Sequence, residues 1–87
     1  MTPSEILREA RARLEADWGP KKTGGHPLNG DYEHADYMRA LFFLRAAYGI
    51  GPDDSLFHRE KGLSKLETLA AYDRAIEFAL SQETASV

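Results

Sequence analysis

Three side chains near the middle of this chain have the chemistry of a transition-metal site. His26, Asp31 and His34 supply two imidazoles and a carboxylate, which are ligands that zinc and similar ions accept. Asp31 and His34 are three residues apart, so on a helix they would share one face. However, the chain has no cysteine, no H-E-x-x-H motif and no other dedicated metal-ligand spacing. We therefore expect neither a metal nor another cofactor.

A second group of neighbours has the residue types of a hydrolytic triad. Asp53, Ser55 and His58 supply a carboxylate, a hydroxyl and an imidazole. Three residues within one turn rarely reach the geometry in which the imidazole bonds both of the other groups. Since no stronger nucleophile–base pattern is present, the sequence predicts a protein that is not an enzyme.

The segment Gly19–Gly30 is the third place where chemistry is conceivable. It reads GPKKTGGHPLNG and holds four glycines and two prolines, so no strand runs through it. Lys21, Lys22 and the pair Gly24-Gly25 have the composition of an anion-binding turn, but they do not form a phosphate-loop motif. We predict a long, solvated loop, which exceeds the usual length of a helix–helix connection.

The elements that position these residues are predicted to be helices. The first helix begins at the capping box Thr2-Pro3-Ser4-Glu5 and ends at Gly19-Pro20. Its apolar residues recur at helical spacing and form one stripe, which consists of Ile6, Leu7, Ala10, Leu14 and Trp18.

Two further helices follow the loop. The second is expected from about Tyr32 to Tyr48, with Asp31 as its N-cap and Gly49 as its left-handed C-terminal cap. The third begins after Gly62 at a second capping box, Ser64-Lys65-Leu66-Glu67. Its expected apolar stripe consists of Leu66, Leu69, Tyr72, Ile76, Ala79 and Leu80.

The predicted fold class is therefore all-α. We expect three main helices packed as a small bundle, with a long Gly/Pro-rich loop between the first two and a short helical turn at Pro52–His58 before the third. No alternating apolar segment indicates a sheet. Residues 1–82 are expected to form one domain and residues 83–87 a flexible C-terminal tail.

The second helix carries more apolar residues than a small bundle can cover. From Ala40 to Tyr48 its one polar residue is Arg45, and the other two helices can cover only two of its sides. We expect Phe42, Leu44 and Tyr48 to be core residues and a strip that includes Phe43 or Tyr37 to remain exposed. Aromatic residues and arginine dominate protein interfaces. The residues predicted to contact a partner are Tyr32, Tyr37, Arg39 and Phe43.

Charge and hydropathy exclude other classes of function. The net charge of −3 and an acidic third helix, which holds Glu67, Asp73, Glu77 and Glu83, make nucleic-acid binding an unfavourable role. The chain contains no apolar run long enough to span a membrane, and its N-terminus is not a signal peptide. We expect a soluble cytoplasmic protein.

The order of these elements resembles an uncharacterised family of small helical proteins from actinobacteria and their phages. The residues that carry the resemblance are Trp18-Gly19 and the ending Tyr72-Asp73-Arg74-Ala75-Ile76. The chain departs from the family pattern at Tyr37-Met38, where the family has Trp-Cys, and at Phe57-His58-Arg59-Glu60, where it has Trp-Asn-Asp. The resemblance implies a small helical fold and a phage-related origin, and it assigns no activity.

Taken together, these residues favour a small, non-enzymatic protein-binding module. Its partner would be another protein or a second copy of the chain in a homodimer, and a phage origin would suggest a host factor such as a defence system. The alternative is a small DNA-binding or metal-dependent accessory protein.

Overall fold

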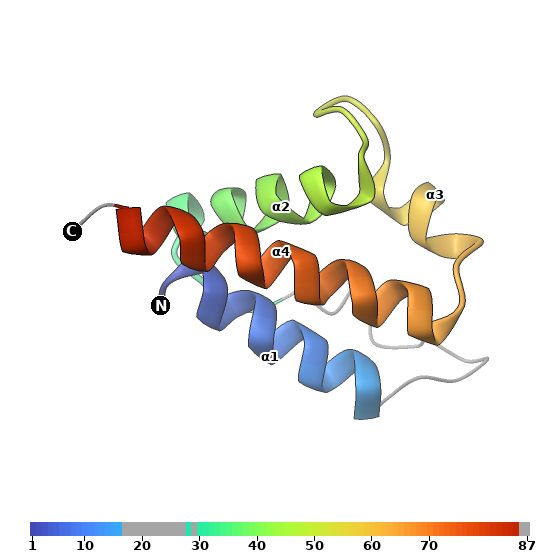
Figure 1. The fold of residues 1–87 in the computed structure, drawn as a ribbon, viewed down its shortest axis with the longest axis horizontal. Helices are drawn as coiled ribbons and strands as arrows, with labels where there is room; N and C mark the ends of the chain where they lie inside the picture. The colour runs from blue at the N-terminus through green and yellow to red at the C-terminus, as the bar shows by residue number, and fades with distance from the viewer. Residues whose placement is uncertain (17–27, 29, 86–87) are drawn as a thin grey trace.

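The computed structural model of this chain describes residues 1–16, 28 and 30–85. These residues fold into four helices and contain no strand, so the predicted all-α class is confirmed (Figure 1). Most of the predicted Gly19–Gly30 loop, with Lys21, Lys22 and His26, lies outside the described residues, as does Trp18. The helices are α1 (Pro3–Ala16), α2 (His34–Tyr48), α3 (Leu56–Lys61) and α4 (Lys65–Ala85).

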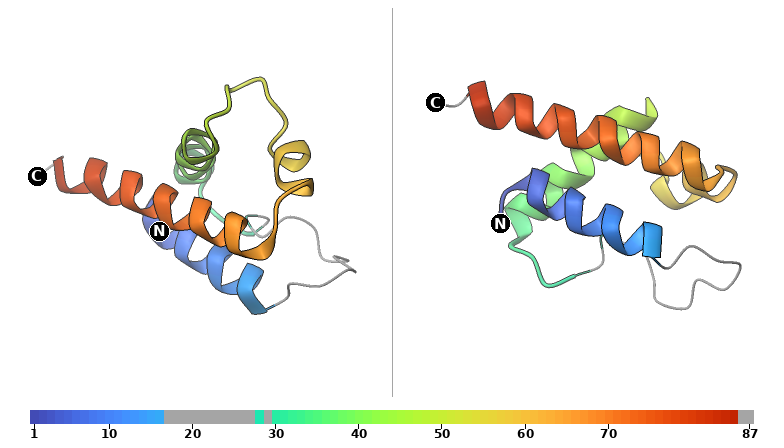
Figure 2. Two further views of the ribbon diagram at one scale, coloured as in Figure 1. Left: turned by 45° about the vertical axis from the view of Figure 1, so that its right-hand side comes forward. Right: turned by 60° about the horizontal axis from the view of Figure 1, so that its bottom comes forward.

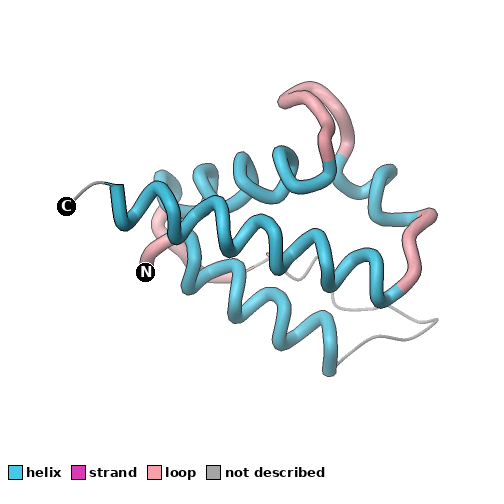
Figure 3. Tube along the Cα trace, viewed as in Figure 1, coloured by secondary structure: helices cyan, strands magenta, loops and turns pink. Residues whose placement is uncertain are grey.

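The longest helix, α4, packs against both α1 and α2 (Figures 1 and 2). Ser4 of α1 contacts Glu83 near the end of α4, whereas Arg11 contacts Asp73 in its middle, so the two helices are antiparallel. An arched loop leads from α2 to the short helix α3, and a tight turn then connects α3 to α4 (Figure 3). The architecture is four helices packed around one core.

Both predicted capping boxes form as reciprocal pairs of hydrogen bonds. The Thr2 N–H donates to Glu5 Oε1 at 2.9 Å, and the Glu5 N–H donates to Thr2 Oγ1 at 3.3 Å. Ser64 and Glu67 repeat this arrangement at the start of α4, at 3.1 and 3.2 Å. The backbone donors stabilise the ionised carboxylates, which lowers the pKa of both Glu5 and Glu67.

Helix α2 begins later than predicted, and Asp31 is not its N-cap. The N-cap residue is Glu33, whose backbone is extended at φ −61° and ψ 133° and whose side chain makes no capping hydrogen bond. The preceding Tyr32 accounts for the difference, because its hydroxyl accepts a hydrogen bond from Arg13 of α1 at 2.6 Å. This contact ties residue 32 to α1, and the helix starts only after it.

The predicted end of α2 is confirmed. Gly49 adopts the left-handed conformation at φ 71°, which favours glycine. Its N–H donates to the Ala46 carbonyl, and the Ile50 N–H donates to the Arg45 carbonyl, both at 3.1 Å. These two bonds form a Schellman motif, which satisfies carbonyls that the helix end leaves free.

The predicted turn at Pro52–His58 is helical only in its second half. Asp54 Oδ2 accepts the Gly51 N–H at 2.9 Å and closes a non-helical turn there. The Ser55 side chain then accepts the His58 N–H at 3.3 Å and caps α3. The helix therefore begins at Leu56 and continues to Lys61, beyond the predicted segment.

The core lies where α1, α2 and α4 meet. The described part of the predicted α1 stripe is buried, and so are Leu69 and Ile76 of α4. Leu66 was predicted to belong to the same stripe but is 80% exposed, because α4 turns this first-turn side chain away from its neighbours. The buried apolar residues are Ile6, Leu7, Ala10, Leu14, Leu28, Ala40, Phe43, Leu44, Tyr48, Leu56, Leu69, Ala71, Tyr72, Ala75, Ile76 and Ala79.

Helix α4 continues to Ala85, beyond residue 82, where we predicted the domain to end. The physical reason is a contact with the start of α1. Glu83 accepts hydrogen bonds from the Ser4 hydroxyl at 2.8 Å and from the Ser4 N–H at 3.2 Å. A carboxylate at a helix N-terminus is also favoured by the helix dipole. Among the described residues, no helix has the length and hydropathy needed to cross a membrane.

Candidate functional site

Phe43, which was predicted to contact a partner, is a core residue. Its side chain is 7% exposed and belongs to the buried cluster. Its neighbour Phe42, which was predicted to be core, is 66% exposed. The two rings meet edge to face with centroids 5.8 Å apart, so the buried ring supports the exposed one. The exposed side of α2 therefore lies one residue away from its predicted position.

Tyr32 and Tyr37 are half-buried rather than free. Both pack against the core. The Tyr32 hydroxyl also donates to Glu9 Oε1 at 3.3 Å, and the Arg13 guanidinium lies 5.8 Å from the centre of the Tyr32 ring. These contacts fix Tyr32 on α1, so it is less available to a partner than the sequence suggested.

The remaining predicted contact residue, Arg39, lies on the outward side of α2. This side carries five exposed residues, which we call the Phe42 face. Met38, one turn before Phe42, is 46% exposed, so two large apolar side chains adjoin there. The Phe42 face consists of Ala35, Met38, Arg39, Phe42 and Ala46.

Arg45 borders the Phe42 face on the side of Leu41. It follows Phe42 by three residues, so the two side chains are neighbours on the helix surface. The side chain is half-buried, and its Nε is buried without a hydrogen-bond acceptor among the described residues. Buried donors are nearly always paired in native proteins, so this group is an exception that calls for an explanation.

Glu60 of α3 is bound by two buried tyrosines. The Tyr48 hydroxyl donates to Glu60 Oε2 at 2.7 Å, and the Tyr72 hydroxyl donates to the same atom at 3.3 Å. Burial, and then the nearby carboxylate charge, raises the pKa of both tyrosines above the ordinary value. This cluster joins α2, α3 and α4, and its groups are bonded to one another, so it is a structural network.

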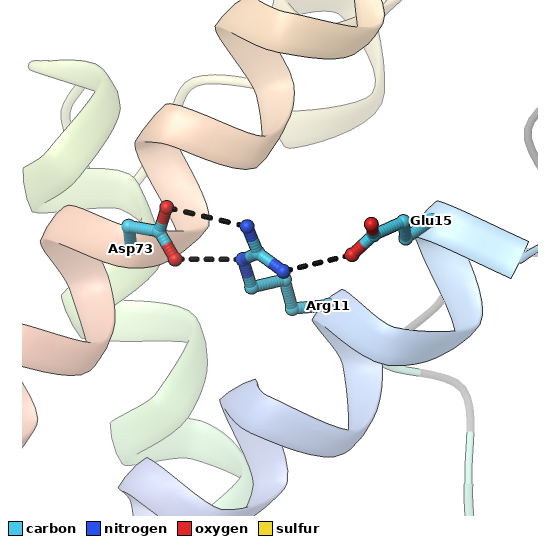
Figure 4. Close-up of polar contacts among 3 residues, drawn as sticks. All are labelled: Arg11, Glu15 and Asp73. Carbon is cyan, nitrogen blue, oxygen red and sulfur yellow. Dashed lines mark hydrogen bonds and ion pairs between the residues drawn. The ribbon is translucent and has the colours of Figure 1, made fainter.

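Arg11 joins α1 to α4 at the surface. Its Nε and Nη2 bond the two oxygens of Asp73 at 2.6 and 3.5 Å, and its Nη1 bonds Glu15 at 2.9 Å (Figure 4). The hydrogen bond with Asp73 raises the pKa of Arg11 above its usual range. The guanidinium is thus fully occupied within the fold, unlike that of Arg45.

The described residues that we considered for a metal site and for a triad have other places in the fold. Asp31 and His34 are both exposed, and no group of three or more potential metal ligands occurs in the described ranges. His26, the third candidate, is outside them. The Ser55 hydroxyl accepts the backbone N–H of His58, so it serves as a helix cap.

Sequence reasoning missed Met38, Phe42 and Arg45. The sequence did contain a signal for the exposed side of α2, namely the positions of its two arginines. Arg39 and Arg45 each lie three residues from Phe42, on either side of it. Charged groups avoid full burial, so the part of the helix surface between the two arginines is expected to face water.

Comparisons with protein-family models, curated proteins and solved structures found no significant match to this chain. The resemblance to small helical proteins from actinobacteria and their phages stays a prediction.

Proposed function

We propose that this chain is a non-enzymatic protein-binding module of the cytoplasm that holds its partner with the Phe42 face. The observation that supports this most directly is the 66% exposure of Phe42, beside the exposed Met38. Apolar side chains that gather on a surface often mark an interaction site, and aromatic residues are frequent binding hot spots.

The arrangement of α2 suits this role. Its inner side is anchored by Ala40, Phe43, Leu44 and Tyr48, and its end is fixed by the Schellman motif at Gly49. A rigid helix presents its outward side chains with little loss of conformational entropy on binding. The Phe42 face is therefore a preorganised surface.

The partner is another protein, with a second copy of the chain as the alternative occupant. The resemblance to phage proteins is the reason to include host and phage proteins among the candidates, for example a component of a host defence system. We propose neither nucleic acid nor membrane as the partner.

Affinity capture with matched variants tests this function. Wild-type chain, Phe42→Ser and Leu66→Ser are used as baits in a lysate of the source cells, and bound proteins are identified by mass spectrometry. Leu66 is the control because it is also apolar and is 80% exposed on a different helix. A captured protein is then purified and its Kd is measured with each variant.

We expect Leu66→Ser to retain the partner and Phe42→Ser to weaken it by about thirtyfold or more, as for a hot-spot residue worth about 2 kcal/mol or more. A partner that binds wild type and Phe42→Ser equally well would refute the proposal.

A further inference from the structure

The guanidinium of Arg45 has no bonded partner among the described residues. Its Nε is buried without an acceptor, and Arg45 makes no ion pair with any described residue. A buried donor without an acceptor carries a free-energy penalty. Since the side chain is only half-buried, part of the guanidinium is accessible to a group from outside.

Arg39, on the other side of Phe42, is a second arginine without an ion-pair partner among the described residues. It is exposed, and among the described residues it forms neither a hydrogen bond to a side chain nor an ion pair. The one carboxylate within α2 is Asp36, and it is paired with neither arginine. By contrast, Asp73 of α4 is engaged by Arg11.

The Phe42 face and its border therefore combine apolar anchors with two cations that have no ion-pair partner in the part of the chain that the structure describes. Met38 and Phe42 form the apolar centre, and Arg39 and Arg45 lie on opposite sides of it along the helix surface. Charge complementarity across an interface sets the choice of partner. The complementary surface is apolar at its centre and carries carboxylates at its edges.

The α2 helix of a second copy does not provide that surface. If two α2 helices paired antiparallel about Phe42, Arg45 of one copy would lie at the level of Arg39 of the other. Such a pairing brings four guanidinium groups together without a carboxylate at that level.

We propose that the partner presents an acidic amphipathic helix to the Phe42 face, with a carboxylate bound by Arg45. This inference rests on the proposed function and specifies the chemistry of the partner. Arginine is suited to this role because its planar fork bonds both oxygens of a carboxylate. The apolar side of the partner helix packs on Met38 and Phe42.

Designed peptides test the proposal. Three fluorescent helical peptides of about 18 residues, long enough to form helix in water, share one apolar face and carry Glu, Gln or Lys at the flanking positions. Their Kd values are measured by fluorescence anisotropy with wild type, Phe42→Ser, Arg45→Gln and the control Arg8→Gln, an exposed arginine of α1. We expect the Glu peptide to bind wild type about tenfold more tightly than the Gln peptide, and the Lys peptide most weakly.

The variants give the decisive readout. Arg45→Gln reduces the advantage of the Glu peptide several-fold, because only Arg39 then faces its carboxylates, and it leaves the Gln peptide unchanged. Arg8→Gln changes neither, and high salt reduces the advantage in wild type. Should Arg45→Gln fail to fold, Arg45→Lys takes its place, and we expect a loss of several-fold for the Glu peptide because Lys lacks the planar fork.

Three outcomes would overturn the proposal. Equal binding of the Glu and Gln peptides, lost in Phe42→Ser, would reject the acidic partner while the proposed function stands. Failure of the Glu peptide to bind at all would also reject the acidic partner. The proposed protein-binding function would then still be tested independently by affinity capture. In the third outcome, duplex DNA at an equal concentration displaces the Glu peptide from wild type but does not bind Arg45→Gln. That result would show that the site binds the phosphates of nucleic acid rather than carboxylates.

Discussion

Glu60 holds three helices together through one oxygen atom. Tyr48 and Tyr72 both donate to its Oε2, at 2.7 and 3.3 Å. Because the acceptor is a carboxylate, the shorter bond should contribute about 1.5–3 kcal/mol to the free energy of unfolding. We expect Tyr48→Phe to lose most of this contribution and Tyr72→Phe to lose less, as measured by urea unfolding. The opposite order of the two variants would contradict this assignment.

The same tyrosines predict a loss of stability at alkaline pH. Burial, reinforced by Glu60, raises the pKa of Tyr48 and Tyr72 in the folded chain above the ordinary 10.0. The unfolded chain releases these protons near pH 10, whereas the folded chain keeps them. The two tyrosines therefore make their full contribution to the free energy of unfolding below about pH 10. Above that pH, each tyrosine lowers the free energy of unfolding by up to about 1.4 kcal/mol per pH unit.

Unfolding measured between about pH 8 and pH 11 checks this sign. The double variant Tyr48→Phe/Tyr72→Phe is expected to lose less stability across that range than wild type. Tyr37→Phe serves as the control, because Tyr37 packs at the edge of the core rather than within it. Identical slopes for wild type and the double variant would show that the two phenols do not cause the alkaline loss.

At this scale, sequence reasoning succeeds where partners are close in the chain. The capping boxes at Thr2 and Ser64 follow from residues three apart, and both form. The bond between Tyr48 and Glu60 spans 12 residues, and that between Arg11 and Asp73 spans 62. Such pairs depend on the packing of whole helices, so neither was predicted.

Among the elements, α4 offers a direct test of its rotation. Leu69 and Ile76 are buried, whereas Leu66 on the same helix is 80% exposed. Replacing a buried Leu or Ile by Ala costs about 2–5 kcal/mol, a large part of the stability of a small domain. We expect Leu69→Ala and Ile76→Ala to lower the melting temperature markedly, and Leu66→Ala to change the free energy of unfolding by less than about 0.5 kcal/mol. A large effect of Leu66→Ala would show that α4 is rotated from this position.

The last turn of α4 should also stabilise the fold. Glu83 accepts two hydrogen bonds from Ser4 at the N-terminus of α1. We expect Glu83→Ala to cost about 1–3 kcal/mol, because it leaves part-buried donors unpaired. Glu77→Ala on the exposed side of the same helix is the control and should change little. Equal thermal denaturation curves for the two variants would show that the contact between Glu83 and Ser4 does not stabilise the fold.

The hydrophobic pattern of α2 did not predict which side of the helix is buried. From Ala40 to Tyr48 nearly every residue is apolar, so periodicity alone cannot distinguish an inward Phe42 from an inward Phe43. Packing against α4 decides the matter, and Phe43 is the buried one. The existence and the end of this helix were predictable, because a local glycine cap specifies the end.

For the molecule as a whole, composition and helical spacing were sufficient to predict the fold class. They predicted a short helical turn at Pro52–His58 but not the bounds of α3, since these depend on Ser55 as a cap and on Glu60 bound to tyrosines of two other helices. The sequence also did not predict which side of α2 is exposed, since Phe42 is the exposed ring and Phe43 is buried. A chain of 87 residues has a thin core, so one misplaced aromatic changes which surface is free for binding.

The size and charge of the Phe42 face predict the state of association of the whole molecule. A standard interface buries about 800 Å² on each side, and the Phe42 face offers two large apolar side chains, Met38 and Phe42. Symmetric pairing of α2 would also place Arg39 and Arg45 of the two copies at the same level, where α2 has no carboxylate. We therefore expect a monomer at about 0.1 mM, which requires a self-association free energy weaker than about −5.5 kcal/mol. Sedimentation velocity over a range of concentrations measures this directly. A dimer at micromolar concentration that Phe42→Ser dissociates, and that Leu66→Ser leaves intact, would instead identify a second copy as the occupant of the Phe42 face.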